Sequence, residues 1–272
     1  MLPVIEMFHS VQGEGQRAGH PSFFVRVSGC NLRCVFKDSI CDTPYSSFNP
    51  EKSQYKDMND LVNAFNELAN QYPNTKDLVI TGGEPLLYKK DLAEFLDKIH
   101  VNRSYYITIE TNGSIEPMDA ATDGWWEIDL YSVSPKLSTS EDKNLKFLSE
   151  EASQRHNKTR KNLDALVKFA ELPYMSYNHV QYKFVYSGKE CVGEIKDLIE
   201  EIKSAYDKKN AEKPWRPVET RNMFIDVWLM PEGITREQLD NTRLDTINAC
   251  IDNGWKYTDR LHILAWGDKR GV

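Results

Sequence analysis

The chain has 272 residues, a formal net charge of −7, 40% hydrophobic residues and 28% charged residues. This balance is typical of a globular protein with a substantial core, and the acidic charge argues against non-specific nucleic-acid binding. No apolar run reaches the roughly 18 residues typical of a membrane-spanning helix, and the first residues lack a secretory signal pattern, so we expect a cytoplasmic protein with no membrane partner.

Short β-branched and aromatic runs alternate with amphipathic helical patterns along the whole chain. The first predicted strand is PSFFVRVSG (21–29), and it leads into a loop that contains three cysteines. Further strands are predicted at 78–81, 105–110, 128–134, 180–187, 224–230 and about 257–265. Helices are predicted around 61–69, 92–99, 141–172, 195–202 and 236–253, the last of them ended by Gly254.

The alternation of strands and helices indicates parallel strands joined by right-handed crossovers. About six such units are present, which is fewer than the eight of a closed barrel. We therefore predict an α/β fold, a partial TIM-type barrel formed by a single domain over residues 1–272. The polar stretch 207–221 is interpreted as an exposed loop within this domain.

Five cysteines in a chain of this length do not suggest a disulfide framework, because three of them are clustered. The clustered residues are Cys30, Cys34 and Cys41. Cys191 and Cys250 are isolated and are interpreted as thiols with no special role.

Three thiolates on one short loop can hold three corners of an iron–sulfur cube and leave the fourth iron open to bind another molecule. A structural zinc site is the alternative, with His9 or His20 as the fourth ligand. Zinc loops usually bring their ligands as two close pairs, and the chain has no second Cys-x-x-Cys motif. The sequence therefore favours the iron–sulfur cluster.

Three small-residue motifs each follow a predicted strand: TGGEP (81–85), TNG (111–113) and SPK (134–136). The carboxyl ends of parallel strands share the edge where α/β proteins build their sites. The adjacent Gly82 and Gly83 let the backbone approach a ligand closely, although a tight turn alone would also explain them. With the cysteine loop at the same edge, the motifs predict a cofactor pocket.

Two charged residues in these motifs have a structural and a functional interpretation. Glu84 can be a favourable charge at the start of a helix, or it can accept from a ligand's ammonium group. Lys136 can be a solvated surface residue, or it can neutralise a ligand carboxylate. An amine acceptor and a carboxylate partner on one rim would together suit an α-amino acid moiety.

The pattern of motifs resembles the radical S-adenosylmethionine superfamily and, within it, the 7-carboxy-7-deazaguanine synthase family. The pieces that carry the resemblance are SVQGEGQRAGHPSFFVRVSGCNLRC, CDTPYS, TGGEP, ETNG, SPK, QYKFV, LMPEG and LHILAWGDKRGV. The similarity runs from about residue 8 to residue 272 and is weakest between about 137 and 177. QGEG and CDT are more specific than GGEP, which many radical enzymes share.

The resemblance implies a lyase that converts 6-carboxy-5,6,7,8-tetrahydropterin to 7-carboxy-7-deazaguanine with loss of ammonia, in queuosine-type deazapurine biosynthesis. A reduced four-iron four-sulfur cluster would split S-adenosylmethionine, and the adenosyl radical would take a hydrogen from the pterin. The protein would position these groups and exclude water. The resemblance also implies a magnesium ion, an electron donor such as flavodoxin, and a homodimer.

The resemblance further implies a role for individual residues. Cys30, Cys34 and Cys41 would ligate the cluster, and Thr43 would hold magnesium. Gln12, Glu14 and Arg26 would be catalytic, and Arg26 suits a substrate carboxylate because a guanidinium pairs with it bidentately. The cofactor would contact Asp42, Gly82, Gly83, Glu84, Ser134, Pro135, Lys136, Gln181 and Lys183. The substrate would contact Gln12, Gly13, Glu14, Arg26, Thr81 and the carboxylate of Val272. His262, in the last predicted strand, would either face the pocket or be a hydrogen-bonded structural residue.

The cluster loop departs from the usual Cys-x3-Cys-x2-Cys spacing of the superfamily. Here the residues VFKDSI lie between Cys34 and Cys41, so Phe36 and Ile40 compete for the position before the last cysteine. A loop can absorb such an insertion because the cost of loop closure grows slowly with length. Two other functions stay open at this point: a glycyl-radical activase, and an iron–sulfur or zinc protein without turnover.

Overall fold

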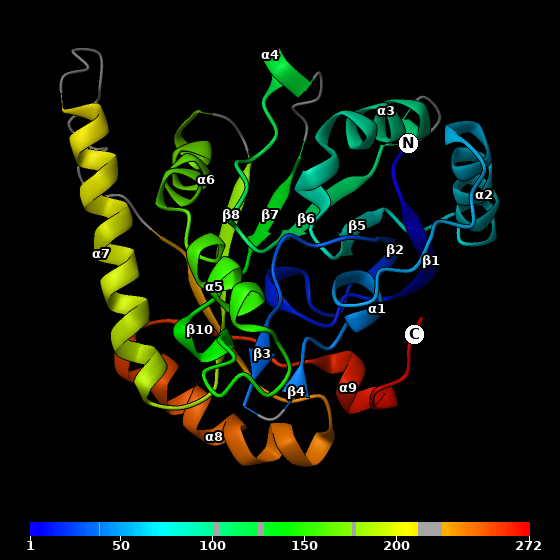
Figure 1. Cartoon of the computed structure of the whole chain (residues 1–272). Coiled ribbons are helices and arrows are strands. Elements are labelled where there is room, and N and C mark those ends of the chain that lie inside the picture. Colours follow the sequence, from blue (N-terminus) through cyan, green and yellow to red (C-terminus); the bar gives the residue numbers. More distant parts are fainter. Residues whose placement is uncertain (38, 101–103, 124–127, 176–177, 212–224) are drawn as a thin grey trace.

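The computed structural model describes residues 1–37, 39–100, 104–123, 128–175, 178–211 and 225–272. An eight-stranded sheet with the order β1-β2-β5-β6-β7-β8-β9-β10 forms its centre (Figure 1). The strands β1 and β2 are antiparallel, and each later pair of neighbours is parallel. The strands are β1 (Val4–Val11), β2 (Pro21–Val27), β5 (Asp77–Gly82), β6 (Tyr106–Thr111), β7 (Leu130–Val133), β8 (His179–Tyr186), β9 (Val227–Pro231) and β10 (Lys256–Tyr257).

Helices connect these strands and cover one side of the sheet (Figure 1). The parallel strands follow one another in chain order, as a partial barrel requires. The sheet is continuous from β1 to β10. The helices are α1 (Pro44–Ser47), α2 (Met58–Gln71), α3 (Lys89–His100), α4 (Ala120–Asp123), α5 (Glu150–Thr159), α6 (Leu163–Met175), α7 (Glu190–Asn210), α8 (Arg236–Asn253) and α9 (Leu261–Trp266), with 3-10 turns η1 (Gly15–Arg17), η2 (Pro85–Tyr88) and η3 (Ser138–Ser140).

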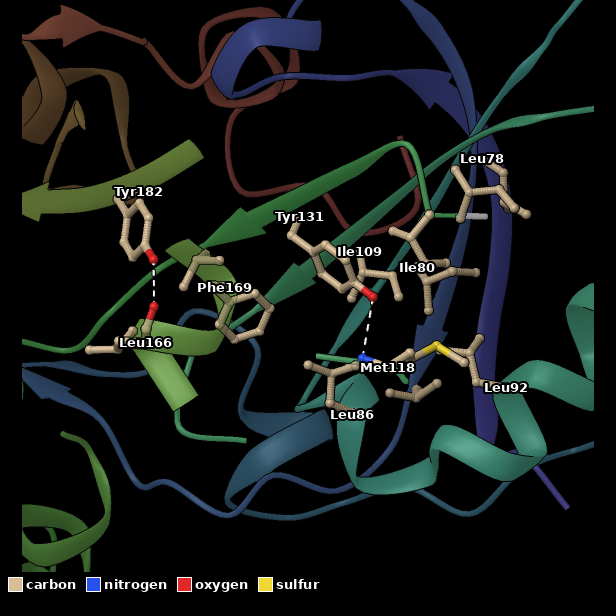
Figure 2. Close-up of a cluster of buried hydrophobic side chains, with 14 of the residues drawn as sticks. Leu78, Ile80, Leu86, Leu92, Ile109, Met118, Tyr131, Leu166, Phe169 and Tyr182 are labelled. Atoms are coloured by element: carbon tan, nitrogen blue, oxygen red, sulfur yellow. Dashed lines mark hydrogen bonds between the residues drawn. The ribbon is translucent and has the colours of Figure 1, made fainter. Parts of the chain in front are cut away.

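The hydrophobic core lies between the sheet and the helices α2, α3, α6, α7 and α8, and Figure 2 shows part of it. Buried tyrosines in the core place their hydroxyl groups on backbone partners, because an unpaired buried polar atom is costly. The Tyr131 hydroxyl accepts from the backbone N–H of Met118, and the Tyr182 hydroxyl donates to the carbonyl of Leu166 (Figure 2). The second bond fixes α6 against β8.

Most predicted elements are present, and the helix α8 ends at Gly254 in the left-handed conformation, as predicted. The strand β1 was not predicted. The last predicted strand, 257–265, is wrong. β10 ends at Tyr257, the chain turns through Thr258 to Arg260, and α9 follows, held in part by the bond from the N–H of Leu264 to the carbonyl of Arg260.

The predicted charged helix 141–172 is in fact two helices preceded by a loop. The carboxylate of Asp142 accepts from the backbone N–H groups of residues 146, 147 and 148, which favours a loop over a helix there. Ser149 then caps the start of α5. The predicted exposed loop 207–221 is wrong at its start, because α7 continues to Asn210; residues 212–224 lie outside the described residues.

Candidate functional site

A cavity of ≈ 770 Å³ opens at the carboxyl ends of the parallel strands. Its volume is within the range of about 300–1,000 Å³ that ligand pockets have. The motifs predicted to share this edge do share it: Gly82, Thr111 and Ser134 all line the cavity together with the cysteine loop. The lining predicted from the sequence comprises Gln12, Gly13, Glu14, Arg26, Cys30, Cys34, Cys41, Asp42, Thr43, Thr81, Gly82, Gly83, Ser134, Lys136, Lys183, His262 and Val272.

Backbone hydrogen bonds hold the GGEP segment against the start of the cysteine loop. The N–H of Gly83 donates to the carbonyl of Val27, and the N–H of Glu84 donates to the carbonyl of Gly29. A Cβ on Gly83 would lie 1.9 Å from the Gly29 carbonyl oxygen, and Gly82 has a φ of +122°. The two glycines are therefore required for this close approach, beyond forming a turn.

The extra residues between the second and third cysteines form a small hairpin. Its strands are β3 (Val35–Phe36) and β4 (Ser39–Ile40), which pair antiparallel. At its base, the N–H of Cys41 donates to the carbonyl of Cys34 at 2.9 Å. The hairpin therefore makes these two cysteines neighbours despite the six residues between them. Both Phe36 and Ile40 line the cavity, so neither is excluded from the contested position.

The three cysteine side chains lie in an environment that disfavours the free thiolate. Burial raises the pKa of Cys30 to about 11 and raises the pKa values of Cys34 and Cys41, with neighbouring negative charges adding to the effect. The ammonium of Lys136 opposes these shifts at Cys30 and Cys34. Thiols in such a place ionise when a metal supplies the compensating charge. The donor set, three thiols on one cavity wall, fits a cube with one open iron.

The zinc alternative finds no fourth ligand among the residues proposed for it. His9 bonds to Thr75 at 2.8 Å and stacks on Tyr72, while His20 lies beside Asp77, and neither histidine lines the cavity. Within the described ranges, no three His, Cys, Asp or Glu side chains converge to hold a single metal ion. An iron–sulfur cube does not need such convergence, because each cysteine binds a different iron.

A chain of alternating charges forms an adjoining wall of the cavity, which begins at Asp42, the residue after Cys41. The Asp42 carboxylate accepts from Arg260 at 2.6 Å, and Arg260 also donates to Glu14 at 3.0 Å. Glu14 accepts from the Lys183 ammonium at 2.5 Å, and that ammonium lies 3.9 Å from Glu110. We call these five residues the charge ladder.

The members of the charge ladder fix each other's protonation. Burial opposes the ionisation of Glu14, but the positive charges of Lys183 and Arg260 outweigh it and hold the pKa of Glu14 well below its usual range. The same balance lowers the pKa of Asp42, where Arg260 prevails over burial, and raises that of Lys183, where Glu14 and Glu110 prevail. Glu14, Asp42, Lys183 and Arg260 are therefore ionised at neutral pH.

The charge ladder connects to the predicted substrate residues through Glu110. The carboxylate of Glu110 accepts from the Thr81 hydroxyl at 2.7 Å and from the Gln12 side-chain amide at 3.2 Å. The pKa of His262 is lowered, chiefly by burial, so its imidazole is neutral near pH 7. A Cβ on Gly13 would lie 2.3 Å from the ring of this histidine, which explains the glycine there.

Arg26 lies at the edge of the cavity between two aromatic rings, with its guanidinium 5.7 Å from the ring centre of Phe8 and 5.8 Å from that of Tyr45. Its Nε donates to Glu6 at 2.8 Å. Glu6 also accepts from Arg270, which brings the last residues of the chain back beside β1 and α1 (Figure 1).

Three residues predicted to contact the cofactor do not line this cavity. Glu84 is fully buried, and its carboxylate accepts from Leu86, Thr111 and Asn112. Glu84 therefore stabilises the GGEP turn from the protein interior, and its interpretation as an acceptor for a ligand's ammonium group is not supported. Gln181 accepts from the N–H of Gln16 and donates to Ser132, so it supports the QGEG loop. Pro135 lines a separate cavity of ≈ 200 Å³.

The sequence analysis missed Arg260 and Glu110. The last strand ends at Tyr257, so Arg260 lies just beyond it, at the rim of the sheet. The predicted strand 257–265 was too long and placed Arg260 inside the strand. Glu110 lies near the end of β6, next to the TNG motif. A charge within an otherwise buried strand end was the available signal for it.

Comparisons with known proteins identify the family of the chain. The sequence profile described as the Radical SAM superfamily matches residues 24–179. A 7-carboxy-7-deazaguanine synthase from Halobacterium salinarum is 37% identical over 270 residues, which are 98% of this chain and 91% of that protein. One from Rhodopirellula baltica is 33% identical over 273 residues, 100% of this chain and 89% of that protein. A solved structure described as QueE from Escherichia coli is 22% identical, covers 95% of this chain and 93% of that chain, and gives a TM-score of 0.49.

The chain belongs to the radical SAM superfamily and, within it, to the 7-carboxy-7-deazaguanine synthase family. This membership confirms the predicted partial barrel and the enzymatic function, with a four-iron four-sulfur cluster and S-adenosylmethionine as cofactors and a small molecule as substrate. It favours the synthase over the glycyl-radical activase. Among the described residues, no helix has the length and apolar character needed to cross a membrane.

Proposed function

We propose that this protein converts 6-carboxy-5,6,7,8-tetrahydropterin to 7-carboxy-7-deazaguanine with loss of ammonia. The observation that carries the proposal is that one cavity joins the three cysteines to the charge ladder and to Gln12 and Arg26. A cluster wall and a wall of fixed charges, facing the same space, suit a radical reaction on a polar heterocycle.

The cofactors would occupy the cysteine side of the cavity. Cys30, Cys34 and Cys41 would ligate the cluster, which, when bound, supplies an electron to S-adenosylmethionine and so generates the species that removes hydrogen from the substrate. The exposed backbone at Gly83 would approach the amino acid part of that cofactor. Lys136, whose ammonium donates to Ser134 at 2.8 Å, would pair with its carboxylate.

The substrate would bind against the charge ladder. Ionised Glu14 accepts hydrogen bonds only, so it would face the N–H donors of the pterin, while Gln12, Gly13 and Thr81 complete that surface. Arg26 would bind the carboxylate of the substrate. His262 is neutral and lines the cavity, so its imidazole can exchange hydrogen bonds with the substrate.

Thr43 would contribute one oxygen to a magnesium ion, because Mg²⁺ keeps several waters and binds substrate oxygens. Its Oγ1 lies 3.4 Å from the Cys41 sulfur and 3.4 Å from an Asp42 carboxylate oxygen, so Thr43 would hold the ion beside one of the proposed cluster ligands. The Asp42 carboxylate is engaged by Arg260 and would orient water around the ion.

The other partners rest on family resemblance. We propose that the protein acts in the cytoplasm as a homodimer, takes its electron from a donor such as flavodoxin, and binds no nucleic acid. The carboxylate of Val272, which lines the cavity, would contact the substrate.

Anaerobic reconstitution tests the proposed reaction. The reconstituted protein is incubated with reductant, S-adenosylmethionine, magnesium and the carboxytetrahydropterin, and the product is followed by mass spectrometry. We expect 7-carboxy-7-deazaguanine and one equivalent of ammonia. Cleavage of S-adenosylmethionine without that product would keep the cofactor assignment and overturn the substrate.

A further inference from the structure

A buried histidine connects the two loops that flank the proposed cofactor. His156 lies on α5, far in sequence from either loop, and only 1% of its surface is exposed. Its Nδ1 is 3.2 Å from the backbone N of Arg33, between the first two cysteines. Its Nε2 is 3.1 Å from the hydroxyl of Ser140, which in turn donates to the carbonyl of Leu137 at 2.7 Å.

The direction of every hydrogen bond in this series is fixed. A backbone N–H can only donate, so Nδ1 of His156 accepts from Arg33 and carries no proton. Nε2 therefore carries the proton and donates to Ser140, whose own proton goes to Leu137. Burial is the main cause that lowers the pKa of His156, to about 4, so the ring is neutral at pH 7 as this arrangement requires.

The two ends of the series lie at functionally distinct places. Arg33 precedes Cys34 directly, and Leu137 follows Lys136, the residue proposed to hold the carboxylate of S-adenosylmethionine. The other side of the cysteine loop is held independently, because Asn31 donates to Ser114 and accepts from Asn112. His156 is the residue through which the backbone N–H of Arg33 is hydrogen-bonded to α5.

We propose that His156 is a positioning residue that sets the distance between the cluster-binding loop and the S-adenosylmethionine-binding loop through the series Arg33–His156–Ser140–Leu137. It gives a role to the stretch 137–177, where the resemblance to the family is weakest. The proposal rests on the proposed function for what the loops bind, but the hydrogen bonds belong to the chain itself.

A pair of substitutions separates positioning from general stability. In His156→Asn, the amide oxygen can occupy the place of Nδ1 and accept from the N–H of Arg33. In His156→Gln, the longer side chain reaches the place of Nε2, so its amide can bond to the Ser140 hydroxyl only. Gln is the better helix former, so a purely structural role predicts that His156→Gln is the milder change. Positioning predicts that His156→Asn is milder.

Amide hydrogen exchange of Arg33 in the full apo chain gives the direct measurement. We expect exchange to rise about five- to tenfold in His156→Gln, as for the loss of one hydrogen bond, and less than about twofold in His156→Asn. After reconstitution, His156→Gln should release iron to a chelator faster and raise the KM for S-adenosylmethionine more than it lowers kcat. The series is overturned if Arg33 exchange is unchanged in His156→Gln, or if the two variants behave alike.

Two further variants keep the test decisive. Ser140→Ala removes only the hydroxyl that orients the ring, so it should raise Arg33 exchange in the same direction by a smaller factor, and no change would contradict the series. His9→Gln alters a histidine that also bonds to a hydroxyl, Thr75, but lies outside the cavity. It should leave Arg33 exchange and iron release unchanged. A failed synthase assay would leave the exchange result intact, so the two proposals fail separately.

Discussion

The two walls of the cavity are built by different means. On the cysteine side, short continuous segments meet through backbone bonds, such as that from the N–H of Gly83 to the carbonyl of Val27. In the adjoining wall, the charge ladder joins single side chains from Glu14 to Arg260, 246 positions apart. The first wall depends on chain geometry and the second on charge balance, so they should respond differently to substitution.

The largest effect is expected on the cysteine side. Cys41→Ala removes one of three proposed ligands, so the reconstituted protein should lack a cluster that binds S-adenosylmethionine and should form no product. Iron and sulfide analysis with electron paramagnetic resonance measures this. Cys191→Ala is the control, since Cys191 is fully buried in the core and does not line the cavity. A complete, cofactor-binding cluster in Cys41→Ala would refute the assignment of this ligand.

On the charge-ladder side, Arg260→Ala should have the next largest effect. It leaves Glu14 and Asp42 without their shared cation, and breaking such a buried pair costs about 3–5 kcal/mol. Urea unfolding measures the loss, and activity should fall even in protein that stays folded. Arg17→Ala is the control, because Arg17 pairs with Asp77 at 2.6 Å outside the cavity. Equal losses of unfolding free energy in both variants would show that the charge ladder stabilises the fold no more than an ion pair outside the cavity.

Gly83→Ala tests the close backbone approach on the cysteine side. Its Cβ would meet the Gly29 carbonyl at 1.9 Å, so the loops must move apart, at a cost of about 2–3 kcal/mol. Thermal unfolding and S-adenosylmethionine affinity should both fall. Gly193→Ala, in α7 with open space around the new methyl group, should instead stabilise the protein by up to about 1 kcal/mol. A neutral Gly83→Ala would show that the approach is not required.

The smallest effect concerns the pH dependence of the charge ladder. The folded-state pKa of Glu14 lies below its ordinary value of about 4.5, so its ionisation stabilises the fold fully above that pH, and the stabilisation is lost as the pH falls toward the folded-state value. Glu14→Gln should therefore be less stable than the natural chain by about 1–2 kcal/mol near pH 7. Urea unfolding from pH 7 to pH 3.5 should show this gap shrinking, and a constant gap would contradict an ionised Glu14.

Features built from contiguous residues could be predicted from the sequence, and pairings between distant residues could not. TGGEP and SPK are contiguous, so their place at the ends of parallel strands followed from the strand–helix pattern. The pairing of Arg260 with both Asp42 and Glu14 did not, because it depends on where the chain turns after Tyr257, and the apolar residues 261–266 suggested a strand. The burial of Glu84 beneath its own turn was equally invisible, since motif position does not reveal which way a side chain points.

Because β3 and β4 pair as a hairpin, the distance between Cys34 and Cys41 does not depend on how many residues lie between them. The backbone hydrogen bond from the N–H of Cys41 to the carbonyl of Cys34 closes the hairpin at its base. Residues added at the tip therefore need not move either sulfur. Lys37, near that tip, is exposed, and its ammonium lies 4.0 Å from Glu232 at the rim of the cavity. The tip is therefore a natural attachment point for a spectroscopic label or a short grafted peptide, close to the cofactors yet outside the ligand set.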